Sequence, residues 1–340
     1  MSAYASSTTE KNAVQKPQRA TFWHTKKFRL LVAAILLVLV LLGGGMYWLL
    51  TPRIKPLALP HVPAHLTWAD IGLEHWQDYQ QPLPEHPLDN TALPAKPQVN
   101  KNLALLQDAA GQALIQQGQN NLGVEYMKAA VLAVPDNLRY ANDLRLAWRD
   151  HQQYKEEEAF FSALNQKYPT INTQIALALS YVDEMRSCPN PPDGLVCQAQ
   201  FSSRSISELS EILTNHPYNI VARYARGLNH LYWPTLMGHL SQSQEDLQFS
   251  VVLTQIQGAI GPSFLPQAYT ALGDVFAKGG KVDVAQNVWE NGLKVAPSST
   301  MLQQRLAIAK ESLVSEEENH LRGLGVYVDT DVAIFWQKGR

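Results

Sequence analysis

The feature that most constrains this chain of 340 residues is a helical pattern that recurs from about Leu103 onward. Gly111 is followed 24 residues later by Pro135, and Gly273 is followed 24 residues later by Pro297. A small residue lets two helix backbones approach closely, and a proline ends a helix because it lacks the N–H that the next turn needs. Repeated along the chain, this unit predicts an all-α solenoid of stacked helix pairs.

The same spacing resembles the tetratricopeptide repeat (TPR), a 34-residue helix pair with glycine at position 8 and proline at position 32. The most specific copies cover residues 104–137 and 266–299. Both also carry the residue types that the family places where its helices cross. These are Leu114, Gly123, Met127 and Ala130 in the first copy, and Tyr269, Leu272, Phe276, Ala285 and Trp289 in the last. The resemblance covers residues 102–322 and implies a TPR-type α-solenoid.

Three weaker copies fill the interval between these two. The second covers residues 138–171 and has Arg145 where the family has glycine. The third begins at Asn172, and its pattern predicts helices over residues 173–185 and 203–215 with about 14 residues inserted between them.

The fourth copy begins near Ile220 and has Gly227 at position 8. After the fifth copy, residues 300–321 are apolar on one side and rich in glutamate on the other, as the last helix of a solenoid must be. We therefore expect about five helix pairs and one capping helix.

An uncharged apolar run of 21 residues occupies residues 30–50. As a helix it would be about 32 Å long, enough to cross the core of a bilayer. Tyr47 and Trp48 lie near its end, where aromatic side chains meet the membrane interface. The run is too long for a cleaved signal peptide and no small-residue cleavage signal closes it, so we expect one N-terminal transmembrane helix, an uncleaved signal anchor. The alternative is a buried helix of a soluble domain.

The charge pattern orients this anchor. The whole chain has a formal net charge of −2, whereas residues 1–29 carry six basic side chains against Glu10 alone, a local charge of +5. By the positive-inside rule, residues 1–29 form a cytoplasmic, disordered basic tail and residues 51–340 are exported, into the periplasm if the source is Gram-negative. The absence of a global basic field excludes nucleic acid as the expected partner.

Residues 51–101 contain nine prolines between positions 52 and 97. Proline at this density prevents a continuous helix and is typical of a semi-rigid spacer. Residues 65–81 are free of proline, and Thr67 could cap a short helix there. We expect that helix to dock on the downstream domain or on a partner.

The inserted segment of the third copy holds both cysteines, Cys188 and Cys197. An exported domain lies in an oxidising compartment, where a local pair is readily oxidised, so we expect a structural disulfide. The Cys-x-x-Cys spacing of a redox-active pair is absent, and two cysteines exclude a four-cysteine zinc site.

The sequence offers no catalytic constellation. None of the ten histidines falls in a metal-binding array such as HExxH, and there is no phosphate-binding or dinucleotide-binding glycine motif. The glutamate triplets at 156–158 and 316–318 are expected on solvated helix faces. We expect no catalytic residue, no metal, no cofactor and no small-molecule substrate.

In TPR proteins, the first helix of each pair lines a concave groove that holds a peptide or a helix of another protein. The resemblance implies such a groove here, and its mixture of polar and aromatic residues favours an extended peptide or a partner helix. The groove residues expected from their positions are Asp108, Gln112, Gln116, Arg139, Asn142, Arg149, Tyr224, Leu228, Tyr232, Asp274 and Lys278.

Residues 323–340 form an apolar C-terminal tail. It is rich in β-branched and aromatic residues, including Tyr327, Phe335 and Trp336. Such a tail is an aggregation hazard unless it is covered. It either folds back on the end of the solenoid or docks into a partner.

These features predict a non-enzymatic, membrane-anchored scaffold or assembly factor that binds a protein partner of a membrane or envelope complex. Residues 30–50 would contact the lipid bilayer. The alternative is a constitutive accessory subunit of a membrane protein complex. Stable co-purification in fixed stoichiometry would favour the subunit, and transient crosslinking would favour the assembly factor.

The predicted topology can be measured with a reporter fused after Arg340. Because the basic tail is retained in the cytoplasm, an alkaline phosphatase reporter should be active and a green fluorescent protein reporter dark. Cytoplasmic fluorescence, or a mature N-terminus near residue 50, would contradict the anchor.

Overall fold

The computed structural model describes residues 30–41, 54–257, 260 and 263–337. The chain divides into two compact units, residues 1–51 and 52–340. In the first unit, residues 30–41 form a helix whose apolar side chains are exposed. No helix among the described residues is long and apolar enough to cross a membrane. The basic tail 1–29 and residues 42–50 of the predicted anchor lie outside the described residues, so the anchor remains a prediction.

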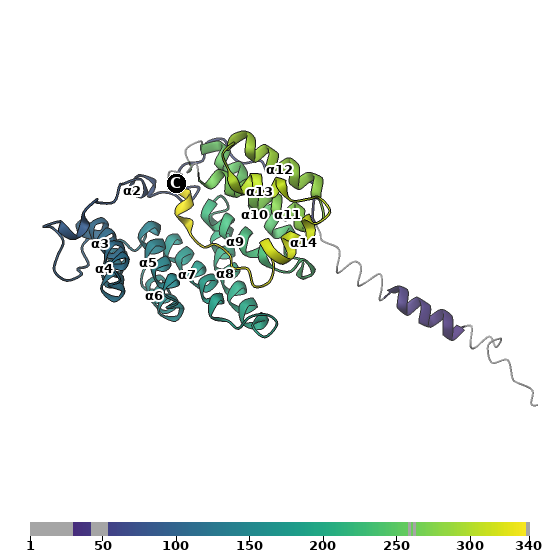
Figure 1. The fold of residues 1–340 in the computed structure, drawn as a ribbon, viewed down its shortest axis with the longest axis horizontal. Coiled ribbons are helices and arrows are strands. Elements are labelled where there is room, and N and C mark those ends of the chain that lie inside the picture. Colours follow the sequence, from purple (N-terminus) through teal and green to yellow (C-terminus); the bar gives the residue numbers. More distant parts are fainter. Residues whose placement is uncertain (1–29, 42–53, 258–259, 261–262, 338–340) are drawn as a thin grey trace, which may run out of the picture. The chain divides into compact units, whose positions relative to one another are not determined.

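The second unit is a series of α-helices, and from α3 to α13 each helix packs against the one that follows it (Figure 1). The pairs are α3 Ala104–Gln116 with α4 Asn120–Ala133, α5 Leu138–Asp150 with α6 Tyr154–Lys167, α7 Ile171–Glu184 with α8 Leu195–Asn215, α9 Ile220–Tyr232 with α10 Leu240–Gln257, and α11 Phe264–Lys278 with α12 Val282–Val295. The all-α fold of sequential helix pairs is therefore confirmed.

Glycine sets how closely the helices of a pair approach. A Cβ added to Gly111 would lie 2.3 Å from Cγ of Met127 and 2.7 Å from the Gly123 carbonyl oxygen, and one added to Gly273 would lie 2.0 Å from Nε1 of Trp289. Trp289 is fully buried there and donates from Nε1 to the Thr270 carbonyl oxygen at 3.1 Å. The first and last pairs cross at contact distance because position 8 has no side chain.

Side-chain caps start several of the first helices. Asn137 accepts from the backbone N–H groups of residues 139 and 140 to start α5, and Asn219 accepts from that of Ala222 to start α9. Thr170 and Thr173 form a reciprocal capping box at α7. These caps satisfy backbone donors that the first turn of a helix leaves without partners.

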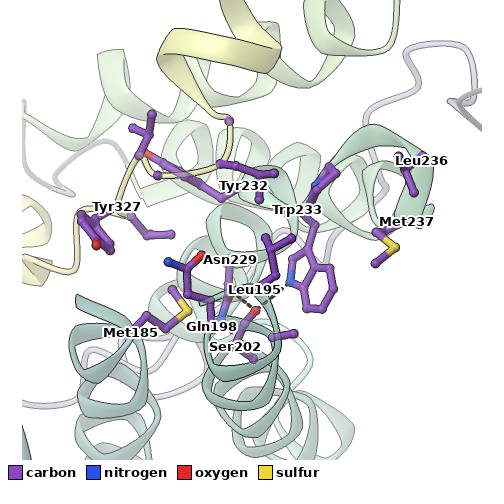
Figure 2. A pocket seen from close by; sticks show the side chains of 17 residues that line it. Met185, Leu195, Gln198, Ser202, Asn229, Tyr232, Trp233, Leu236, Met237 and Tyr327 are labelled. Carbon is purple, nitrogen blue, oxygen red and sulfur yellow. Dashed lines mark hydrogen bonds between the residues drawn. The ribbon is translucent and has the colours of Figure 1, made fainter. Parts of the chain in front are cut away.

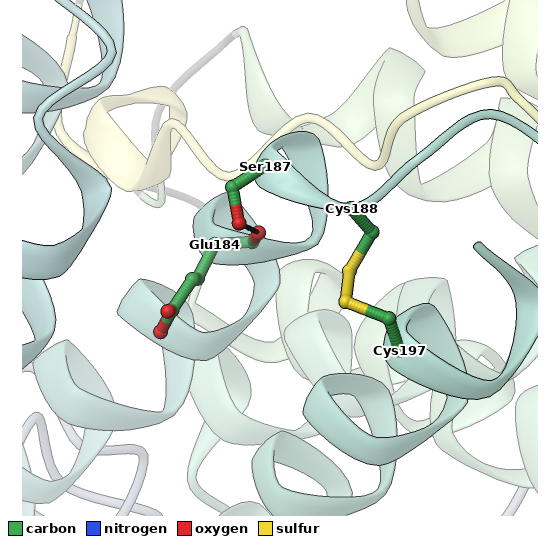
Figure 3. Close-up of a disulfide and its surroundings, with 4 residues drawn as sticks. All are labelled: Glu184, Ser187, Cys188 and Cys197. Atoms are coloured by element: carbon green, nitrogen blue, oxygen red, sulfur yellow. Dashed lines mark hydrogen bonds between the residues drawn. A yellow bond between two sulfur atoms is a disulfide. The ribbon is translucent and has the colours of Figure 1, made fainter.

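The insertion in the third pair becomes helix rather than loop. Helix α8 begins at Leu195, eight residues before the predicted Ser203, and runs for 21 residues. The short helix η4 Met185–Ser187 follows α7, and the disulfide between Cys188 and Cys197 joins it to the start of α8 (Figure 3). The predicted disulfide is confirmed.

The predicted capping helix over residues 300–321 is wrong as a single element. Helix α13 Thr300–Ala307 ends where Ile308 takes an extended conformation, and α14 Leu313–Glu316 continues as the π-helix Glu317–Leu321. This break turns Leu313, which is fully buried, toward the core of the domain. Burial of that side chain favours the turn over a continuous helix.

The proline-rich segment is not a free spacer. Over the predicted helix 65–81, only α2 Trp76–Tyr79 is helical, because Gly72 takes a positive φ of 77° and Thr67 closes a local turn with Asp70. Ile71 and Leu73 are fully buried in the main core, and the Ile220 N–H donates to the Ile71 carbonyl oxygen at 2.9 Å. Two short 3-10 helices, Pro87–Asp89 and Lys101–Leu103, complete the segment.

Both glutamate triplets also differ from expectation. Glu157 and Glu317 are fully buried, whereas the sequence predicted solvated helix faces. Glu156, beside Glu157, is exposed as predicted. The middle glutamate of each triplet lies on the packed side of its helix. A run of three identical residues does not indicate which of them is buried.

The close crossing at Gly273 predicts a measurable cost for one methyl group. Gly273→Ala should lower the free energy of unfolding by about 1–3 kcal/mol, because the new Cβ meets the Trp289 indole and the core cannot expand freely. Urea unfolding of the full-length chain measures this. In a Trp289→Leu background the same change should cost less; an equal cost in both backgrounds would show that the crossing is not the cause.

Candidate functional site

The first helices of the pairs form one face of the solenoid, and the C-terminal segment lies along it. We call residues 322–337 the strap. The first-helix face is formed by α5, by α7 with the short helix η4 that follows it, by α9 and by α11. In Figure 1 the strap is the yellow segment that runs from α14 past α9 toward the marked C-terminus. From the sequence, this tail could either fold back on the end of the solenoid or dock into a partner. The structure shows a third arrangement.

A buried charged cluster holds the centre of the strap. The Arg145 guanidinium pairs with Asp183 of α7 and donates to both the carbonyl oxygen and the hydroxyl of Thr330. The Thr330 hydroxyl in turn donates to Asp183 Oδ1 at 2.6 Å. Arg145, Asp183 and Thr330 are all at most 2% exposed. Charged groups so deeply buried persist only because they are paired, so the strap residue completes the pair's hydrogen bonding.

On either side of this cluster, side chains of the first-helix face bind the strap backbone. The Asn142 side chain accepts from the Val332 N–H at 3.2 Å and donates to Asp331 Oδ1 at 3.0 Å. Arg186 donates to the Val328 carbonyl oxygen at 3.0 Å, and its guanidinium lies 4.9 Å from the Tyr327 ring centroid. These contacts bind strap backbone groups on both sides of Thr330 and, in addition, the side chains of Asp331 and Tyr327.

The start of the strap is bound through Lys278 and Asp274. The Lys278 ammonium is buried and donates to three carbonyl oxygens, including that of Arg322 at 2.7 Å. Burial lowers the pKa of this ammonium, and Glu318 opposes that shift. Asp274 accepts from Arg305 and from Arg322 at 2.9 Å each.

The end of the strap is held by aromatic packing. Phe335 is fully buried against Phe264, with ring centroids 4.2 Å apart, and against Tyr224 at 6.0 Å. Trp336 packs on Tyr79 of α2 with ring centroids 4.7 Å apart, and Gln80 donates to its carbonyl oxygen at 2.9 Å. The proline-rich segment and the strap therefore meet here.

Some of the predicted groove residues contact the strap, and one contacts the proline-rich segment. Asn142 and Arg149 contact the strap beyond Arg322, Tyr224 contacts Phe335, and Tyr232, Asp274 and Lys278 contact Arg322. Arg139 instead donates to backbone carbonyl oxygens of the proline-rich segment, at 2.6 Å for Gln81.

The remaining groove residues lie at the first pair or inside the core. Gln112 bridges the carboxylates of Asp108 and Asp143, at 2.9 and 3.1 Å, and Gln116 is exposed. Burial, reinforced by the nearby Asp143 charge, raises the pKa of Asp108 well above its usual range. Leu228 is buried. Binding of a partner by any of these residues remains a prediction.

The sequence did not indicate the residues that make most of the contacts between the first-helix face and the strap. These are Arg145, Asp183 and Arg186 on the face, and Arg322 and Thr330 in the strap. One signal was available. Arg145 stands at position 8 of the second copy, where the first and last copies have glycine. An arginine buried where two helices cross requires a hydrogen-bond acceptor beside it.

Glu157 lies in the same buried region. Both of its carboxylate oxygens are buried without a hydrogen-bond partner among the described residues. Burial, reinforced by the negative charge of Asp183, raises its pKa to about 10. The side chain is therefore protonated in the folded protein at neutral pH.

One group of side chains could place metal-ligand atoms together among the described residues, namely Glu74, His75 and Asp136. His75 Nε2 is 3.0 Å from Asp136 Oδ2, and Asn172 donates to Glu74 at 3.1 Å. The hydrogen bond to Asp136 raises the pKa of His75. These bonds fasten the proline-rich segment to the turn between α4 and α5, and account for the group without a metal.

No protein-family model and no curated protein matches this chain. Among solved structures, it is similar to the crystal structure of a thermophilic TPR protein from Thermus thermophilus. The TM-score is 0.45 at 16% sequence identity, and the alignment covers 60% of this chain and 97% of that chain.

The raised pKa of Glu157 predicts the direction of one pH dependence. Above about pH 5 the unfolded chain has lost this proton and the folded chain keeps it, so this group lowers stability by about 1.4 kcal/mol for each further pH unit up to about pH 9. Glu157→Gln removes the titration. Its stability relative to wild type, from urea unfolding, should therefore rise with pH.

Glu156→Gln, at the exposed neighbour on the same helix, is the matched control and should leave the pH profile unchanged. A stability difference between Glu157→Gln and wild type that stays constant across this pH range would contradict the assignment.

Proposed function

We propose that this protein is a non-enzymatic, membrane-anchored scaffold that binds an extended segment of a protein partner on its first-helix face. The observation that carries the proposal is the strap itself. Side chains of α5, α7, α9 and α11 bind or pack on this one segment, which is extended up to Asp331 and forms the 3-10 helix Val332–Phe335 beyond it. The contacts are buried charges, backbone hydrogen bonds and aromatic packing.

The mode of strap binding supports a general peptide site. The carbonyl oxygens of Arg322, Val328 and Thr330 and the Val332 N–H are all bound by side chains of the face. Backbone groups are common to every peptide, so a partner segment with similar side chains can make the same bonds. In this proposal the strap occupies the face until such a segment replaces it.

Membrane anchoring belongs to the proposal because of the apolar run 30–50 and its basic flank. A partner in or at the membrane then meets the scaffold at high effective concentration, since both are confined to the same surface.

The alternative function, a permanent accessory subunit, is favoured by the filled state of the face. Phe335, Val332 and Thr330 are almost fully buried by this chain's own helices. A protein whose face is permanently filled would contact its complex through other surfaces.

Strap exchange tests the proposal. Leu324 and Gly325 are exposed, so a protease site introduced there can be cut after the full-length chain has folded. A fluorescent peptide of residues 326–337 should then bind the cut chain and not the uncut chain, measured by fluorescence polarisation. Asn142→Ala should weaken this binding by about 5- to 30-fold, because it removes two hydrogen bonds.

Gln116→Ala is the control, because Gln116 is exposed at the end of α3, outside the first-helix face, and it should leave binding unchanged. Failure of the peptide to bind the cut chain would show that the strap is a permanent part of the fold, and the accessory-subunit function would then be preferred.

A further inference from the structure

A pocket remains open beside the strap while the strap is seated. Its volume is about 320 Å³, and it lies between the first turns of α8, the end of α9, the 3-10 helix Thr235–Met237 and strap residues 323–328. Figure 2 shows Met185, Leu195 and Tyr327 around the same space as Trp233 and Met237. The volume is in the lower part of the range of about 300–1,000 Å³ that is typical of ligand sites.

The chemistry of the lining restricts what can enter. None of the residues that line the pocket is charged, and most of their side chains are aliphatic or aromatic. A charged group would lose its hydration there without gaining an ion pair, so the occupant must be uncharged and apolar where it enters. The two methionines, Met185 and Met237, have flexible side chains that adapt to the shape of an occupant.

Among the described side chains that line the pocket, one buried donor has no hydrogen-bond partner. Ser202 donates to Asn229 Oδ1 at 2.6 Å and accepts from Trp233 Nε1 at 2.7 Å, so these three satisfy one another (Figure 2). The Gln198 Nε2 atom is buried and has no hydrogen-bond partner among the described residues. A buried donor without an acceptor is costly, so an occupant with a carbonyl oxygen near Gln198 would be favoured.

The rim of the pocket distinguishes a protein from a small molecule. Leu236, Met237 and Leu324 line the pocket and are 59%, 54% and 47% exposed, so they form its apolar rim. A small ligand inside the pocket would leave this apolar rim in water, whereas a polypeptide that inserts one side chain would cover the rim with its neighbours.

We propose that this pocket anchors an uncharged, extended segment of a protein partner, with one bulky apolar side chain inside and a backbone carbonyl accepting from Gln198. The segment must be extended there because the carbonyls of a helix are already bonded within the helix. This inference rests on the proposed scaffold function, but it uses a site that stays open while the first-helix face is filled.

Displayed random dodecapeptides, selected on the full-length chain in lipid nanodiscs and counter-selected on empty nanodiscs, test the inference. Enriched peptides should share a bulky apolar residue between uncharged neighbours. A synthetic copy of the most enriched peptide should lose at least about tenfold in affinity for Ala199→Phe, which fills the pocket from α8. It should lose about 2- to 10-fold for Gln198→Met, which keeps the size of the side chain and removes the donor.

Val196→Phe is the matched control, because Val196 is on α8, 70% exposed and outside the pocket. Equal affinity for wild type, Ala199→Phe and Gln198→Met would overturn the anchor site. If those peptides bind the cut chain described above in competition with the 326–337 peptide, the scaffold function stands and only the pocket is wrong. No enrichment on either the intact or the cut chain would overturn both proposals.

Discussion

The close crossing of the two helices in each pair is the constraint on which the rest of this structure depends. Where position 8 is glycine, as at Gly111 and Gly273, the next helix lies against the backbone itself and no side chain can be added. That contact fixes the orientation of each pair, and stacking of the pairs then places all first helices on one face. The buried charged contacts to the strap described above are made by side chains of that face.

The second pair has no glycine at position 8, and the residue in its place binds the strap. Arg145 occupies position 8 there and is fully buried, so it needs an anionic partner and further acceptors. Asp183 of the next pair supplies the charge, and Thr330 of the strap supplies two acceptors. Without Thr330 these buried donors would lack acceptors, so the face needs either the strap or another segment that supplies equivalent acceptors.

The two proposed sites differ in what they recognise. The first-helix face binds backbone groups along the strap as well as the side chains of Thr330, Asp331 and Phe335, so it recognises both a backbone path and particular side chains. The pocket beside residues 323–328 has no charge and one unused amide donor, so it selects for an apolar side chain. A scaffold with both features can hold a partner at the pocket before any strap exchange occurs.

The repeat pattern by itself determined the helix pairs, because the period of glycine, apolar residues and proline is a local property of the chain. It also located the disulfide, since both cysteines fall in one inserted segment. The second repeat copy was predicted to start at residue 138, which is where α5 begins, because Asn137 caps it locally. The single helix predicted at residues 300–321 was wrong, because burial of Leu313 decides the break.

Only the tertiary structure decided where the two flanking segments lie. Thr330 is 185 residues from Arg145 in the chain, and no periodicity connects them. The composition of the tail showed that it must be covered, but not by what. The positions of Arg139, Asn142 and Lys278 on first helices were predictable from the repeat. Their contacts with the chain's own backbone were not, because such contacts depend on which segment distant in the sequence packs against the face.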